Sequence, residues 1–264
     1  MAVDLQTDRP HAARIYDYVL GGKDNFEADR GVAEQMMAAS PLLEPSMRAN
    51  RRFMARCAGH LAERGFRQFL DIGTGLPTHP NLHEVVQTIA PDANIMYVDN
   101  DPIVLVHARA LLTRVLGSTG VIEYLDADLR APEAIFSAPQ FGAAIDLSKP
   151  VAVTVIAILQ LIDDDDARRI IDDIMSRVPS GSALALSAVC DAADPEGVDR
   201  ILKVANAGGV PVRSRSLAGV EALFGGLELD DVGVVSVQHW RPGKEDEAIA
   251  EAKLGMYGGI AYKP

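Results

Sequence analysis

Residues 69–78 read Phe69-Leu70-Asp71-Ile72-Gly73-Thr74-Gly75-Leu76-Pro77-Thr78, an apolar run that ends in two glycines one residue apart. The run predicts a strand and then a sharp turn, in which both glycines let the backbone approach a ligand where a Cβ would clash. A helix should follow, with Pro80 at its first position and apolar residues at helical spacing, namely Leu82, Val85, Val86 and Ile89. This order favours the first half of a nucleotide-binding βαβ unit, although an ordinary strand-to-helix turn would read the same.

The next apolar run supports the nucleotide-binding interpretation. Ile95-Met96-Tyr97-Val98-Asp99 predicts a second strand that ends in an acid 24 positions after Gly75. In such units an acid at this place accepts hydrogen bonds from ribose hydroxyls. Asp101-Pro102 then predicts the start of another helix, with Asp101 as its N-cap.

Composition and charge limit the class of protein. The 264 residues are 48% hydrophobic, which is enough for a sizeable core. A net charge of −12 argues against nucleic acid or an anionic membrane as a partner, because the field repels phosphate. Cys57 and Cys190 are unpatterned and fit reduced thiols. With neither a signal peptide nor a membrane span in the pattern, we expect a soluble cytoplasmic protein.

Three further runs predict parallel strands separated by helices: Val121–Leu125, Val151–Ile158 and Ala183–Val189. Regular alternation of strands and helices argues for a doubly wound α/β sheet with helices on both faces. After the fourth run, Asp163-Asp164-Asp165-Asp166 opens a helix, where acids complement the helix dipole better than they suggest a metal site. His79, His83 and His107 have no partners at usable ligand spacing, so we predict no metal.

The end of the chain departs from this alternation. Leu227–Asp230 and Val232–Val237 predict two short strands with no room for a crossover helix, so we expect them to be antiparallel to each other. The tail, Ala248–Pro264, predicts a short helix and then a Gly-rich coil. A doubly wound, Rossmann-like sheet that closes with an antiparallel strand is the architecture of class I methyltransferases, whereas a dinucleotide-dependent dehydrogenase would continue with a second βαβ half.

The segment before the first strand predicts helices. Gly21-Gly22 ends the first one, and Asp24-x-x-Glu27 resembles a capping box for the second. No separate core is obvious in these helices. We therefore expect residues 1–65 to form a helical lid or flank on an α/β domain of residues 66–264, together one compact unit.

Three strings resemble one family. They are Arg14-Ile15-Tyr16-Asp17-Tyr18-Val19-Leu20-Gly21-Gly22-Lys23-Asp24-Asn25-Phe26, then Gln68 to Thr78, and Tyr97-Val98-Asp99-Asn100-Asp101-Pro102. The chain resembles the actinobacterial S-adenosylmethionine-dependent methyltransferase family of largely unknown function, the DUF574 group, from about Ala12 to the tail. The resemblance implies a class I methyltransferase fold and S-adenosylmethionine as cofactor, and it implies no known acceptor. Gln160-Leu161 stands where the family usually has a His or aromatic residue, which argues against His-dependent acceptor chemistry.

The carboxyl ends of the strands supply most of the predicted cofactor contacts, because ligands of open α/β sheets bind there. Gly73 and Gly75 should approach the methionine and ribose through their backbone. Asp71 should bind the amino group, directly or through water, although it could be only a turn acid. We expect Asp99 to hold the ribose hydroxyls, with Asn100 beside the adenosine.

The third and fourth strands complete this prediction. Asp128 should accept from the adenine amino group while Leu129 packs on the ring; Asp126 is the competing acid, and Asp128 could instead be a helix cap. Ala157 and Ile158 should line the methionine arm.

A loop and a strand end supply the remaining candidates. The Gly21–Asn25 loop could fold over the cofactor, with Lys23 meeting the methionine carboxylate and Tyr16 forming a wall. In the alternative, Asn25 caps a helix and Lys23 is solvated. Gln160 is a candidate contact of the acceptor.

The pattern predicts an S-adenosylmethionine-dependent methyltransferase that acts on a small molecule. A sulfonium already carries an activated methyl, so the absence of a catalytic triad does not count against this function. Catalytic residues cannot be named from the sequence. The alternatives are a non-catalytic S-adenosylmethionine-binding protein and a nicotinamide-dependent oxidoreductase, which would want a small residue in place of Thr78.

Overall fold

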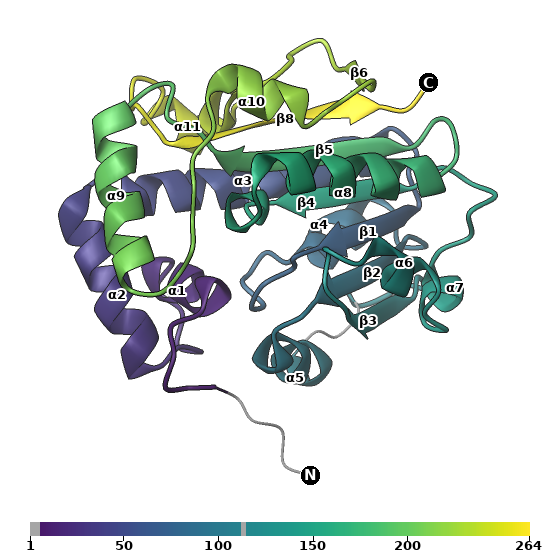
Figure 1. Cartoon of the computed structure of the whole chain (residues 1–264). Coiled ribbons are helices and arrows are strands. Elements are labelled where there is room, and N and C mark those ends of the chain that lie inside the picture. The colour runs from purple at the N-terminus through teal and green to yellow at the C-terminus, as the bar shows by residue number, and fades with distance from the viewer. Residues whose placement is uncertain (1–5, 112–114) are drawn as a thin grey trace.

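The computed structural model describes residues 6–111 and 115–264, and its centre is one mixed sheet (Figure 1). Five parallel strands come first in the chain: β1 (Gln68–Ile72), β2 (Asn94–Asp99), β3 (Ile122–Asp126), β4 (Ala152–Ile156) and β5 (Ala183–Val189). Their order in space is β3-β2-β1-β4-β5. The chain moves outward from β1 in one direction and returns to add β4 on the other side, so the topological switch point lies between β1 and β4.

Antiparallel strands close the sheet, in a different arrangement from the one predicted. β8 (Met256–Tyr262) pairs with β5, and both β6 (Glu228–Leu229) and β7 (Val235–Ser236) pair with β8. The predicted pairing of the two short strands with each other is therefore wrong, and so is the predicted Gly-rich coil. A Cβ on Gly258 would lie 2.3 Å from the Leu186 carbonyl oxygen, so the tail glycines permit a close strand contact.

Helices cover both faces of the sheet, because the central strands β1, β2, β4 and β5 are buried on both sides. One face packs against α3 (Leu43–Glu63) and α4 (Leu82–Ile89). The other packs against α6 (Pro132–Phe136), α7 (Phe141–Ala144), α8 (Asp164–Arg177) and α10 (Leu217–Ala222). Four shorter or peripheral elements are α5 (Pro102–Leu111), α11 (Lys244–Glu247) and two short 3-10 helices, η1 (Leu159–Leu161) and η2 (Val237–His239).

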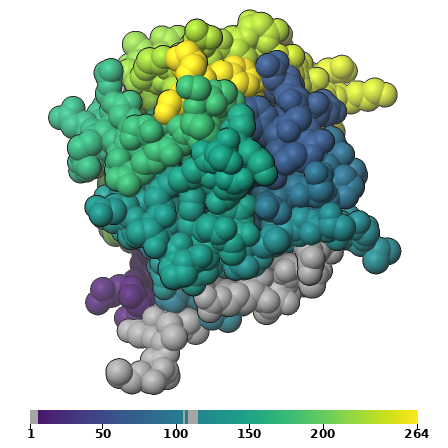
Figure 2. Space-filling model, turned by 90° about the vertical axis from the view of Figure 1, so that its right-hand side faces the viewer, coloured from purple at the N-terminus to yellow at the C-terminus, as the bar shows by residue number. Residues whose placement is uncertain are grey.

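The end of the chain is fastened to the end of α8 at the face shown in Figure 2, where the yellow C-terminal residues lie among green ones. Lys263 Nζ donates to the carbonyl oxygens of Met175 at 2.8 Å and Val178 at 2.7 Å. A lysine here pairs with carbonyls that the end of α8 leaves without helical partners.

A helical group stands at the other end of the molecule, where Figure 1 shows α1 (Ala12–Val19), α2 (Glu27–Ala39) and α9 (Pro195–Ala207) together. These helices share an apolar cluster that includes Ile15, Val32, Met36 and Ala205. The sequence showed no such core because α9 contributes to it from far along the chain.

The helices begin at capping residues, and only some of these were predicted correctly from the sequence. Asp101 Oδ1 accepts from the Ile103 amide at 2.9 Å, as expected of an N-cap. The predicted capping box at Asp24 is wrong, because Asp29 Oδ2 accepts from the Phe26 amide at 2.9 Å and α2 begins after Phe26. The prediction for Pro80 is also wrong, since Asn81 is the N-cap of α4.

Candidate functional site

A cavity of about 240 Å³ opens at the carboxyl ends of the parallel strands, beside the switch point. Eleven of the thirteen predicted contact residues line it: Tyr16, Asp71, Gly73, Gly75, Asp99, Asn100, Asp128, Leu129, Ala157, Ile158 and Gln160. Lys23 and Asn25 do not. The structure thus brings together residues from four strand ends and from the first helix.

The glycine turn forms one wall of the cavity. Gly73 and Gly75 have φ of +74° and +68°, a conformation that costs other residues free energy. A Cβ on Gly73 would lie 2.7 Å from the side chain of Ile158, whereas one on Gly75 would meet nothing within 4 Å. The backbone at Gly75 is therefore open to a closely approaching ligand.

Asp99 ends β2 and is held in place by backbone amides. Its Oδ2 accepts from Gly75 at 2.8 Å and its Oδ1 from Asp101 at 2.9 Å. Burial raises the pKa of this carboxyl. Because each carboxylate oxygen can accept a further hydrogen bond, Asp99 retains capacity for two ligand hydroxyls.

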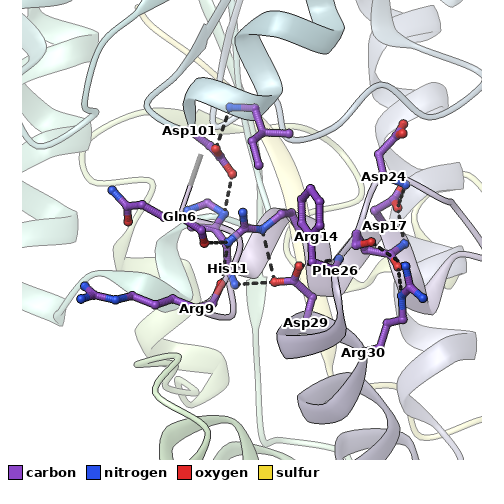
Figure 3. A network of polar contacts seen from close by, with 12 residues as sticks. Gln6, Arg9, His11, Arg14, Asp17, Asp24, Phe26, Asp29, Arg30 and Asp101 are labelled. Carbon is purple, nitrogen blue, oxygen red and sulfur yellow. Dashed lines mark hydrogen bonds and ion pairs between the residues drawn. The ribbon is translucent and has the colours of Figure 1, made fainter. Parts of the chain in front are cut away.

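The N-terminal segment reaches the same strand end. His11 Nδ1 lies 3.0 Å from Asp101 Oδ2 (Figure 3). The backbone amide of His11 donates to Asp29 at 2.8 Å, and Arg14 pairs with the same buried carboxylate at 3.2 Å. These contacts fix the entry of α1 over the cavity.

Asp128, after β3, also borders the cavity and is hydrogen-bonded to Asn100, after β2. Asn100 Nδ2 donates to Asp128 Oδ2 at 3.2 Å, while Asp128 Oδ1 accepts from the Arg130 amide at 2.8 Å. Leu129 is buried next to them. The competing acid Asp126 is exposed and does not line the cavity.

Asp71, in β1, is a buried acid of the cavity lining. Burial raises its pKa to about 6, against the lowering effect of a 2.5 Å hydrogen bond from Thr154 Oγ1 and of the positive charge of Arg51. Thr154 is a polar residue inside the apolar strand β4, and its contact with Asp71 was not predicted.

Arg51 was also missed. It projects from α3 into the cavity lining, and its guanidinium donates to the carbonyl oxygens of Thr78 and, at 2.7 Å, Pro80. Its Nε is buried and has no hydrogen-bond partner among the described residues. A signal was present in the helical spacing, because Arg51 stands three residues before the buried Met54 and so falls on the same face of α3.

A chain of hydrogen bonds ties the helical group to the strand ends. Tyr16 donates to the Met47 carbonyl at 3.0 Å, and Asn50 Nδ2 donates to Tyr16 Oη at 3.1 Å. Ser187 Oγ donates to Asn50 Oδ1 at 2.7 Å and accepts from the Ala157 amide at 3.2 Å. Burial raises the pKa of the Tyr16 hydroxyl, which keeps it neutral as a hydrogen-bond donor.

Ala157 and Gln160 form a tight turn after β4. Ala157 has φ of +53°, which is strained for a residue other than glycine, and strain of this kind is concentrated at functional sites. Gln160 Nε2 donates to the Ala157 carbonyl at 2.6 Å. Gln160 Oε1 is buried without a hydrogen-bond partner among the described residues.

Lys23 and Asn25 lie outside this arrangement. Asn25 Nδ2 donates to Asp17 Oδ2 at 2.8 Å, and Arg30 Nε donates to Asn25 Oδ1 at 2.8 Å, so Asn25 fastens the loop to α1 and α2. Lys23 is exposed. Their contact with a cofactor stays a prediction, and it would require the loop to move.

The described residues provide neither a cluster of metal ligands nor a membrane-spanning helix. Within residues 6–111 and 115–264, no group of three or more His, Cys, Asp and Glu side chains is placed to hold a metal ion. No helix in that same part of the chain is both long and apolar enough to cross a membrane.

Comparison with known proteins identifies the family. A sequence profile described as S-adenosyl methyltransferase matches residues 1–264. A DUF574 family protein from Streptomyces avermitilis is 43% identical, with a TM-score of 0.94 over 99% of this chain and 100% of that one. A Thermobifida fusca protein, by its description a candidate methyltransferase, is 35% identical, with a TM-score of 0.89 over 98% and 97%.

More distant structures agree in fold alone. The plantazolicin methyltransferase BpumL, solved with SAH, has a TM-score of 0.52 at 10% identity over 96% of this chain and 95% of that one. No curated protein is similar enough to match. The predicted class I methyltransferase fold is confirmed, and the chain belongs to the S-adenosyl methyltransferase family, whose cofactor is S-adenosylmethionine.

Proposed function

We propose that this protein transfers the methyl group of S-adenosylmethionine to a small-molecule acceptor, and that one cavity holds both. The observation that carries the proposal is the continuity of that cavity, which runs from the glycine turn and three acids to a region walled by apolar side chains. The negative net charge favours a small acceptor over nucleic acid, and we place the reaction in the cytoplasm.

The nucleoside part fits the ends of β1, β2 and β3. Asp99 holds the ribose hydroxyls, with Asn100 beside them. Asp128 accepts from the adenine amino group while Leu129 packs on the ring. The open backbone at Gly75 gives the ribose room to lie close to the turn, and this is the fit that the cavity offers to an adenosine.

The methionine part of the cofactor carries an ammonium and a carboxylate, so it needs one negatively and one positively charged partner, and the cavity supplies both. Asp71 binds the ammonium group and Arg51 binds the carboxylate, with its unpartnered Nε available as a donor. The sequence predicts Lys23 for this role, but Lys23 is exposed in the structure and does not line the cavity. The Gly73 backbone, with Ala157 and Ile158, lines the arm between these charges and the sugar.

The cofactor supplies an activated methyl group when it is bound. The protein holds the acceptor in line with that group and excludes water. We propose that residues 1–65 form a lid for this purpose on the α/β unit of residues 66–264. Tyr16 and Asn50 fix the inner wall of that lid by their hydrogen bonds to the strand ends.

A non-catalytic role is the second candidate, in which the protein binds S-adenosylmethionine without transferring its methyl. The neutral amide of Gln160 at the acceptor end favours it. Calorimetric titration tests the cofactor binding that both candidates require. We expect S-adenosylmethionine and S-adenosylhomocysteine to bind and NAD not to bind. Binding of NAD alone contradicts both candidates, and an acceptor screen with labelled methyl then separates enzyme from binder.

A further inference from the structure

The cavity continues beyond the proposed cofactor contacts into an apolar compartment. Its walls are Ile15, Met36, Met47, Leu161, Val210 and Val212, all members of the apolar cluster shared by the helical group or packed against it. Methionine side chains adapt to irregular apolar ligands. Leu161, one of these walls, follows Ile158 by three residues, so this compartment adjoins the proposed methionine arm.

Charged groups near the compartment already have partners. Asp17 lines the cavity, but its Oδ2 accepts from Asn25 at 2.8 Å and from the Asp24 amide at 3.0 Å. His11 lies 3.0 Å from Asp101. An ionised acceptor would therefore lose its hydration without gaining an unused countercharge, which disfavours its binding.

One polar atom beside the compartment is unsatisfied. Gln160 Nε2 is engaged by the Ala157 carbonyl at 2.6 Å, and this bond leaves the amide oxygen Oε1 buried without a partner among the described residues. A buried acceptor of this kind destabilises the protein until a donor reaches it. A ligand that carries an N–H or O–H would supply that donor.

Resting on the proposed function, we propose that the methyl acceptor is an uncharged, largely apolar molecule that binds among these side chains and donates one hydrogen bond to Gln160 Oε1.

Four probes that share an indole ring test this proposal. Protein labelled with ¹³C in its methionine methyl groups and saturated with S-adenosylhomocysteine is titrated with indole, 1-methylindole, indole-3-carboxylate and tryptamine. Indole should shift the methyl signals of the cavity residues Met36, Met47 and Met54 and leave that of Met175, in the core beside α8, unchanged. 1-Methylindole should bind about fivefold more weakly, because it lacks the donor. The anionic and cationic probes should bind at least about tenfold more weakly.

Two variants and one control test whether Gln160 and the apolar compartment are responsible for the binding of indole. Gln160→Leu should bind indole and 1-methylindole equally. Val212→Lys should abolish indole binding by placing a charge in the compartment, and Arg213→Ala, at the exposed neighbouring residue, should leave it unchanged.

The same samples separate this inference from the proposed function. If S-adenosylhomocysteine fails to bind, the proposed function fails. If it binds and a charged probe binds as well as indole, or no probe shifts the three cavity methionines, or Gln160→Leu keeps the preference for indole, the acceptor assignment is wrong.

Discussion

Protonation of Asp71 should control the affinity for the amino-acid end of the cofactor. Its pKa is raised to about 6 by burial, and binding an ammonium requires the ionised form. Affinity should therefore fall as the pH falls through 6. At pH 5 about one protein in eleven is ionised, so the Kd of S-adenosylhomocysteine should be about tenfold weaker than at pH 7.5, or about 1.4 kcal/mol. Asp71→Asn should weaken binding about tenfold to a hundredfold at pH 7.5 and remove this dependence on pH.

Calorimetric titrations from pH 5 to 7.5 measure both effects, with 5′-methylthioadenosine as the control ligand. That nucleoside lacks the ammonium and carboxylate, so any dependence on pH that it shows reports Asp99 and other groups near the sugar. A flat profile for S-adenosylhomocysteine, or the same slope in wild type and Asp71→Asn, would refute the role given to Asp71.

Three further changes test the remaining parts of the site. Arg51→Met should weaken S-adenosylhomocysteine about tenfold to a hundredfold and leave 5′-methylthioadenosine unaffected, while the exposed control Arg48→Met should change neither Kd; equal losses for both ligands would contradict the carboxylate contact. Gly75→Ala should weaken both ligands and lower the free energy of unfolding by about 1–2 kcal/mol, measured in urea, because φ there is +68°; unchanged affinity would show that no ligand lies against this backbone. Asn50→Ala should cost about 1–3 kcal/mol of stability by the same method, because it leaves the Ser187 hydroxyl without its acceptor, and a loss below about 0.5 kcal/mol would contradict that account.

The parallel half of the sheet was predictable because its strands are continuous apolar runs. The fifth was expected at Ala183–Val189 and is observed there. The fourth ends at Ile156, two residues before its predicted end, because Ala157 turns the backbone to positive φ. Local sequence does not show that turn, since alanine rarely adopts it.

The antiparallel half was not predictable from local signals. Glycines usually indicate a coil, but Gly258 and Gly259 in β8 stand where neighbouring backbone comes too close for a Cβ. That contact is made with β5 and with residues near Gly233, which lie far away in sequence. Both β6 and β7 pair with this strand, although the sequence suggested that they would be antiparallel to each other.

The site residues also divide into those that could be predicted from the sequence and those that could not. Residues at or just after the ends of strands, such as Asp99 and Asp128, could be placed because the carboxyl ends of parallel strands share one edge. Arg51 and Asn50 reach the cavity only through the packing of α3, which precedes the sheet in sequence. Asn25 was predicted to contact the cofactor because it lies in a loop that matches a family motif. In the structure its side chain is hydrogen-bonded to Asp17 and Arg30 instead.

A crystal structure of the complex with S-adenosylhomocysteine would test the central claim most directly. We predict that the nucleoside lies across the ends of β1 and β2, with both ribose hydroxyls about 2.6–3.2 Å from the carboxylate oxygens of Asp99. Ligand bound elsewhere, or a ribose that does not contact Asp99, would contradict the account.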